Sequence, residues 1–255
     1  GPDKTRTVVL VHGFSVPYYI WDPTFDALTR EGFRVLRYDL YGRGLSDRPK
    51  TRYDADLYDQ QLIDLLDSLQ IDGPIDLAGV SMGGPIVATF ANRHPQKVRS
   101  LVLIDPGFQE GRKPPFRLRT PVLGELVMSM IVAPHLPVSQ LSDFHNPKAF
   151  HDWSQKFRSQ MRYRGFRHAL LSTIRFYAPR DTRDDYARIG RSNRPVLLIW
   201  GEHDRAIGTR IPDRVLSLIP QAQMHLIKDA GHLPHLERPN AVNPLLLAFL
   251  RGDSQ

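Results

Sequence analysis

Short apolar segments alternate with amphipathic segments along most of this chain, and this alternation constrains the fold more than any other feature. The amphipathic segments carry stripes of apolar residues at helical spacing. One stripe consists of Leu62, Leu65, Leu66 and Leu69, and the last one consists of Val242, Leu245, Leu246 and Phe249. Six short runs are predicted to be strands: residues 7–11, 33–38, 75–80, 101–104, 196–200 and 224–227, of which residues 7–11 form an apolar run typical of a buried strand. Strands that alternate with helices need crossover connections, which make the strands parallel. The sequence therefore predicts an α/β fold, with a mostly parallel central sheet and helices on both of its faces.

The interval 107–193 interrupts this alternation. Apolar helical stretches occupy residues 123–132 and 166–176. The segments before, between and after them are rich in proline: Pro114, Pro115, Pro121, Pro134, Pro137, Pro147 and Pro179. We predict a mainly helical cap over residues 107–193, inserted into a single core formed by residues 1–106 and 194–255.

The predicted cap also carries the excess positive charge. The chain has a net charge of +7, and residues 106–194 contain 16 Lys and Arg against 7 Asp and Glu. The simpler interpretation of this charge is a solvated face of the protein. The alternative interpretation is a surface that contacts anionic lipid or an acidic substrate. No nucleic-acid-binding motif accompanies the charge, so we expect no nucleic-acid partner. The sequence indicates no oligomeric state.

Composition narrows the chemistry and the location. The chain has no cysteine, which excludes disulfides, thiolate catalysis and cysteine-based zinc sites. No apolar run reaches the ~18 residues of a membrane span, and the given sequence does not open with an apolar signal segment. We expect a cytoplasmic protein slightly more than an exported one, although an export signal or an anchor could precede the given sequence.

A turn between an expected strand and an expected helix carries the strongest chemical signal. Residues 78–84 read Ala-Gly-Val-Ser-Met-Gly-Gly, with Gly79 and Gly83 two positions to either side of Ser81. A serine hydroxyl is a weak nucleophile unless it is exposed, oriented and deprotonated by a neighbouring base. In a G-x-S-x-G turn, small residues let the backbone close so that the serine Oγ projects above the sheet. We predict that Ser81 is a nucleophile, rather than part of a glycine-rich turn without chemistry.

Two later loops supply a base and an acid for this serine. His232 precedes the last helix, and Asp204 follows the strand at 196–200. The order Ser, Asp, His is the one found with this type of turn. Asp204 would accept the Nδ1 proton of His232, whose Nε2 would take the Ser81 proton. Asp105, at the end of another strand, is the alternative acid.

Other histidines have weaker claims. His12 lies in a loop that suits backbone support better than general-base catalysis. His232 and His235 are three residues apart, but Pro234 lies between them and no third ligand is evident, so we expect no metal site.

These motifs together resemble the α/β-hydrolase superfamily, among its capped esterase, lipase and monoacylglycerol-hydrolase-like members. The resemblance rests on residues 9–14 (Val-Leu-Val-His-Gly-Phe), 38–47, 78–84, 200–204 (Trp-Gly-Glu-His-Asp) and 231–237, which span most of the chain outside the cap. It implies an oxyanion hole formed by the backbone N–H groups of Phe14 and Met82. It also implies an antiparallel hairpin ahead of the first strand, where only a few residues precede Thr7.

The expected reaction is the hydrolysis of a carboxylic ester through an acyl-enzyme, with no cofactor. Small esters, acylglycerols and aliphatic polyesters are all candidate substrates, so the expected partner is a small-molecule or lipid-like ester. One alternative is C–C bond hydrolysis or perhydrolysis by the same triad, although residues 14–17 (Phe-Ser-Val-Pro) lack the glycine-rich loop of many C–C hydrolases. Another is a receptor-like binding protein with little turnover.

Aromatic side chains are candidates for the pocket wall, although ordinary packing explains them equally well. They are Tyr18, Tyr19 and Trp21 near the first loop, and Phe108, Trp153, Phe157 and Phe176 in the cap.

Overall fold

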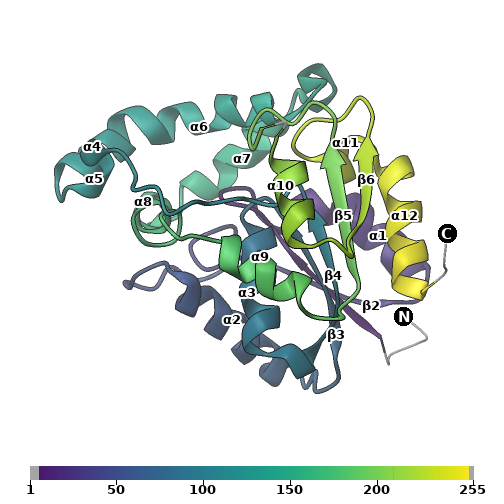
Figure 1. Ribbon diagram of the computed structural model, residues 1–255. Helices are drawn as coiled ribbons and strands as arrows, with labels where there is room; N and C mark the ends of the chain where they lie inside the picture. The colour runs from purple at the N-terminus through teal and green to yellow at the C-terminus, as the bar shows by residue number, and fades with distance from the viewer. Residues whose placement is uncertain (1–5, 209, 253–255) are drawn as a thin grey trace.

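A computed structural model describes residues 6–208 and 210–252 and confirms the predicted α/β fold (Figure 1). Six strands form one sheet in the order β2-β1-β3-β4-β5-β6, and every neighbouring pair is parallel. The strands are β1 (Thr7–Val11), β2 (Arg34–Tyr38), β3 (Ile75–Val80), β4 (Val98–Ile104), β5 (Val196–Gly201) and β6 (Gln223–Ile227). β4 begins three residues earlier than predicted, and the other strands match to within one residue. The hairpin implied ahead of Thr7 would fall on residues that lie mostly outside the described range.

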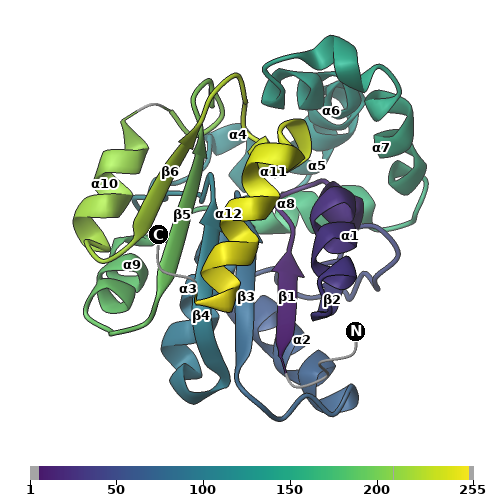
Figure 2. The ribbon, with the colours of Figure 1, turned by 90° about the vertical axis from the view of Figure 1, so that its right-hand side faces the viewer.

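Helices cover both faces of the sheet. Their bounds are α1 (Asp22–Arg30), α2 (Ala55–Ser68), α3 (Gly83–Arg93), α9 (Arg183–Gly190), α10 (Ile211–Leu218), α11 (Pro234–Glu237) and α12 (Pro239–Arg251). Figure 2 shows α1 and α12 on the near face of the sheet, and they contact each other. On the other face, α3 contacts both α2 and α9. Local sequence sets several helix ends: Asp54 accepts a hydrogen bond from Leu57 N at 3.1 Å and begins α2.

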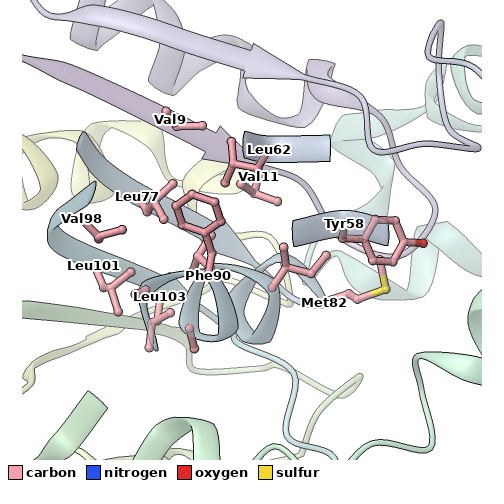
Figure 3. Packing of buried hydrophobic residues seen from close by; sticks show 14 of the residues in the cluster. Val9, Val11, Tyr58, Leu62, Leu77, Met82, Phe90, Val98, Leu101 and Leu103 are labelled. Carbon is pink, nitrogen blue, oxygen red and sulfur yellow. The ribbon is translucent and has the colours of Figure 1, made fainter. Parts of the chain in front are cut away.

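Alternate residues of the strands bury their side chains under opposite helix layers, as the period of two requires. Beneath α2 and α3 lie Val9, Val11, Leu77, Leu101, Leu103 and Leu198, packed with Leu62 and Phe90 (Figure 3). Beneath α1 and α12 lie Val8, Leu10, Val80, Val102, Ile104 and Ile199, packed with Leu28 and Leu246. The central strands are therefore apolar on both sides, which explains why they appear in the sequence as continuous apolar runs.

The interval 107–193 is helical, and its parts pack differently. It contains α4 (Phe116–Arg119), α5 (Leu123–Val127), a π-helical turn (Met128–Val132), α6 (Ala133–Ser139), α7 (Trp153–Met161) and α8 (Phe166–Phe176). These helices gather beside one end of the sheet (Figure 1). By contrast, α9 contacts α3 and α10. The division of the chain into core and cap remains a proposal, in which we count α9 with the core.

Short 3-10 helices complete the secondary structure at Tyr18–Trp21, Pro95–Lys97, Gln140–Asp143 and Pro147–Phe150. Among the described residues, no helix is both long and apolar enough to cross a bilayer.

The arginines of the cap do not share one helix face. A single helix through Arg158, Arg162, Arg164 and Arg167 would group several of them. Instead, α7 ends at Met161, and Gly165 has a φ of 93°, which turns the chain before α8 begins. A contact between the basic cap and anionic lipid stays a prediction, which flotation with anionic and neutral vesicles would test.

The buried phenyl ring of Phe90 tests the packing beneath α3. The side chain is fully buried, and the substitution Phe90→Ala leaves a cavity that the layers on either side cannot fill. We expect the free energy of unfolding to fall by about 3 to 5 kcal/mol, measured by urea denaturation. The matched control is Phe176→Ala, because this side chain is 41% exposed and should cost about 1 kcal/mol or less. Equal losses in the two variants would contradict the assigned core.

Candidate active site

Ser81 occupies the turn between β3 and α3 in a strained backbone conformation. Its φ is 54°, in the left-handed region that residues with a side chain rarely adopt. Three hydrogen bonds hold the turn: Ser81 N donates to Ile104 O at 3.0 Å, and Ser81 O accepts from Gly84 N at 2.9 Å and Gly107 N at 2.8 Å. Among the described residues, Ser81 Oγ makes no hydrogen bond, and the side chain is half-buried.

Two glycines make this turn possible. A Cβ on Gly79 would lie 2.4 Å from Gly83 O, and a Cβ on Gly83 would lie 2.4 Å from Val11 O. Only a residue without a side chain permits such close backbone approach. Gly13 also lies against the serine, since a Cβ there would be 3.1 Å from Ser81 Cβ. The loop after β1 therefore borders the hydroxyl directly.

His232 and Asp204 meet beside this turn. His232 Nδ1 lies 3.0 Å from Asp204 Oδ2, and both side chains are buried. Asp204 Oδ1 accepts hydrogen bonds from Ala206 N at 2.8 Å and Ile207 N at 3.2 Å. Burial opposes ionisation of both groups, but their mutual hydrogen bond and opposite charges outweigh it. The pKa of Asp204 is lowered and the pKa of His232 is raised relative to their ordinary values.

Asp105 lies near this pair without forming a hydrogen bond to His232 among the described residues. Its Oδ1 accepts from Gly201 N at 3.0 Å, and the three side chains offer atoms within 4.8 Å of one another. Burial, together with the negative charge of Asp204, raises the pKa of Asp105 well above its ordinary value. A protonated Asp105 would avoid placing two negative charges side by side in the core.

His12 is held by the backbone on both sides of its ring. Nδ1–H donates to Gly13 O at 2.8 Å, and Nε2 accepts from Leu40 N at 2.9 Å. Burial lowers the pKa of His12 to about 4, so the ring is neutral near pH 7. This arrangement supports the loop and leaves no ring nitrogen free for proton transfer.

Two backbone N–H groups remain available next to the serine. In the described part of the chain, neither Phe14 N nor Met82 N donates a hydrogen bond to another residue. Unpaired N–H groups are uncommon where the surroundings are largely buried. Such groups can stabilise an oxyanion if they point at the position where it forms.

A cavity of about 290 Å³ opens onto Ser81 and His232. Its wall is mostly apolar. The lining residues come from the segment after β1, the turn after β3, the interval between β4 and β5, and the loops after β5 and β6: Gly13, Phe14, Ser15, Val16, Ile20, Ser81, Gln140, Asp143, Ala206, Ile207, His232 and Leu233. No Lys or Arg is among these described lining residues. The aromatic residues proposed from sequence do not line it; for example, Trp153 packs edge-on against Phe144, with ring centroids 5.1 Å apart.

Asp143 is a residue of this site that sequence reasoning missed. It ends a 3-10 helix of the cap, and its backbone O accepts a hydrogen bond from His232 N at 2.7 Å. Burial raises the pKa of its carboxyl to about 6, against the attraction of His232. Nothing in the local sequence marks it, because its position depends on how residues 140–143 pack against the loop that carries His232.

Comparison with known proteins places this geometry in context. A family model described as the alpha/beta hydrolase fold matches residues 6–239. A 2-hydroxy-6-oxononadienedioate/2-hydroxy-6-oxononatrienedioate hydrolase of Cupriavidus pinatubonensis is 31% identical, over 96% of this chain and 86% of its own. Lipase 3 of a Moraxella species is 27% identical, over 90% of this chain and 72% of the lipase. The solved structure of a thermophilic esterase from Thermogutta terrifontis has a TM-score of 0.80 at 23% identity. The match covers 98% of this chain and 90% of the esterase chain, and it supports the fold.

The raised pKa of Asp143 predicts how stability depends on pH. Between the ordinary value near 4 and about 6, the folded state holds a proton that the unfolded state has lost, so stability falls as pH rises through this window. We expect Asp143→Asn to unfold at a higher temperature than wild type at pH 8, and at the same temperature at pH 4. Scanning calorimetry at both pH values measures this. Equal transition temperatures at pH 8 would show that the carboxyl is ionised without penalty.

Proposed function

The chain belongs to the α/β-hydrolase family, and on that premise we propose that it is a serine hydrolase that cleaves uncharged carboxylic esters. One observation carries the proposal: Ser81 at the strained turn and His232 border the same cavity, and the Nδ1 atom of His232 is paired with Asp204. This is the set of groups that acyl transfer requires, namely a nucleophile, a base and a group that orients the base.

The proposed reaction proceeds in two steps, acylation of Ser81 and hydrolysis of the acyl-enzyme. Ser81 Oγ attacks the ester carbonyl carbon while His232 Nε2 accepts the hydroxyl proton. The N–H groups of Phe14 and Met82 stabilise the negative oxygen of the tetrahedral intermediate. The bond to the alcohol breaks, and His232 gives its proton to the leaving alcohol. Water then attacks the acyl carbon while His232 Nε2 takes one of its protons. The bond to Ser81 Oγ breaks, Oγ receives that proton from His232, and the carboxylic acid leaves.

The alternative that deserves a test is C–C bond hydrolysis. The 31% identical Cupriavidus enzyme favours it, and the name of that enzyme specifies a dicarboxylate substrate. A dicarboxylate needs positive partners, because burying an unpaired carboxylate is unfavourable. No described residue lining the cavity is Lys or Arg, and Asp143 would add repulsion once it ionises. These observations favour an uncharged ester over a dicarboxylate.

The first test concerns the nucleophile. A fluorophosphonate probe should label the protein once, at Ser81, as measured by intact-mass and peptide mass spectrometry. Ser81→Ala should abolish the label. The matched control is Ser15→Ala, because Ser15 lines the same cavity and lies outside the turn. Labelling that survives in Ser81→Ala would overturn the assignment.

The second test separates the two acids. Asp204→Asn should lower kcat by about 10⁴, because the backbone N–H groups of Ala206 and Ile207 hold the amide oxygen, so the amide NH2 faces His232 Nδ1 and leaves the ring in the wrong tautomer. Asp105→Asn should have a much smaller effect, because an amide resembles the protonated carboxyl that burial favours there. Steady-state kinetics on p-nitrophenyl butyrate measures both. The opposite order of effects would assign the acid to Asp105.

The third test concerns substrate charge. We expect kcat/KM for p-nitrophenyl butyrate to exceed that for the p-nitrophenyl ester of glutaric acid, which carries a terminal carboxylate, by about tenfold or more at pH 8. Asp143→Asn should narrow this ratio, because it removes the facing charge. A preference for the charged ester would contradict the uncharged-substrate proposal and favour the C–C hydrolase alternative.

A further inference from the structure

Three side chains from separate loops converge outside the catalytic cavity. His145 belongs to the cap, His203 follows β5, and Asp229 follows β6. Each offers a ligand atom, and these atoms lie within 4.8 Å of one another. The two imidazole rings are stacked, with centroids 4.1 Å apart. We propose that His145, His203 and Asp229 form a binding site for a divalent transition-metal cation of the Zn²⁺ type.

The backbones that carry these ligands are already joined by hydrogen bonds. His203 N donates to Ala230 O at 2.8 Å, next to Asp229. Glu202 Oε2 accepts from Asp229 N at 3.3 Å, which links the loops after β5 and β6. The cap is tied in by Glu237 Oε1, which accepts from Asn146 N at 3.1 Å, beside His145. The segments that carry the three ligands are therefore held near one another before any ion binds, whereas the ligand side chains can still rotate.

The donor set matches a borderline metal better than a hard one. Two imidazoles and a carboxylate are ligands that Zn²⁺ accepts, whereas Mg²⁺ and Ca²⁺ prefer oxygen alone. Glu202 Oε2 lies 3.6 Å from His203 Nε2 and is outside the set of three ligands. Ligand bonds near 2.1 Å in a tetrahedron separate the donors by about 3.4 Å, so small side-chain rotations would close the site. His145 and Asp229 are exposed, which leaves room for that movement and for entry of the ion.

A bound ion would link the cap to both loops of the catalytic pair. His203 adjoins Asp204, and His145 is two residues from Asp143, whose carbonyl accepts the His232 N–H. The ion would thus hold the cap segment against the loop that carries His232. This inference does not depend on which bond the enzyme cleaves.

Calorimetric titration of the EDTA-treated full chain with ZnCl₂ tests the site. We expect one ion per chain, little heat with MgCl₂, and a binding constant weakened about tenfold or more in His145→Ala and in His203→Ala. Zinc should also raise the melting temperature of the wild type and protect the amides of residues 143–146 from hydrogen exchange.

Two controls keep the test specific. His151→Ala removes another exposed cap histidine and should bind zinc like the wild type. His232→Ala should also retain binding, which distinguishes the proposed site from the cluster of Asp105, Asp204 and His232. Without zinc, the melting temperature of His145→Ala and of His203→Ala should match the wild type. Three results would overturn the proposal. The wild type could show no saturable zinc binding, or a His145→Ala/His203→Ala double variant could bind zinc as the wild type does. Alternatively, His151→Ala could lose as much zinc affinity as the ligand variants.

Discussion

The close approach of α3 to the ends of β1 and β3 is the constraint on which the rest of the site depends. The backbone around Gly79, Ser81 and Gly83 is packed so tightly that a Cβ on either glycine would overlap a carbonyl oxygen. This crowding stabilises the positive φ of Ser81, which would otherwise be unfavourable by about 1 to 3 kcal/mol. The turn keeps this strained conformation because the parallel sheet, buried on both faces, holds both strands in place. The serine is thus presented at the edge of a rigid core rather than on a mobile loop.

Electrostatics next to this turn are organised by burial. Asp204, Asp105 and His232 share a small buried volume, in which three ions would be strongly unfavourable. The structure separates their pKa values, because Asp204 has the histidine and two backbone N–H groups as partners, whereas Asp105 has one N–H. One carboxyl therefore favours the ionised state and the other the neutral state. Such divergent environments for equivalent groups are typical of sites that transfer protons.

The helices of the proposed cap border the site and are tied to the rest of the chain by buried polar groups. Gln160 of α7 donates to Ser15 O at 2.8 Å and accepts from Gly44 N at 3.1 Å. Arg43, which is fully buried, donates to Phe14 O at 2.8 Å and to Thr173 Oγ1 of α8 at 2.9 Å. The loop that bears the Phe14 N–H is thereby held between core and cap. The position of the cap thus influences both the shape of the cavity and the alignment of the proposed oxyanion donors.

The sequence by itself determined the sheet, its parallel strands and the strand–turn–helix around Ser81, because periodicity and glycine spacing are local properties of the chain. It also singled out Asp204 and His232, since each follows a recognisable strand. Only the tertiary structure brought His232 to Asp204 rather than to Asp105, because both acids end neighbouring strands and the difference lies in how the final loop packs. The same holds for Asp143 and for the convergence of His145, His203 and Asp229. These residues come from loops far apart in the sequence, and no local pattern encodes a distance between loops.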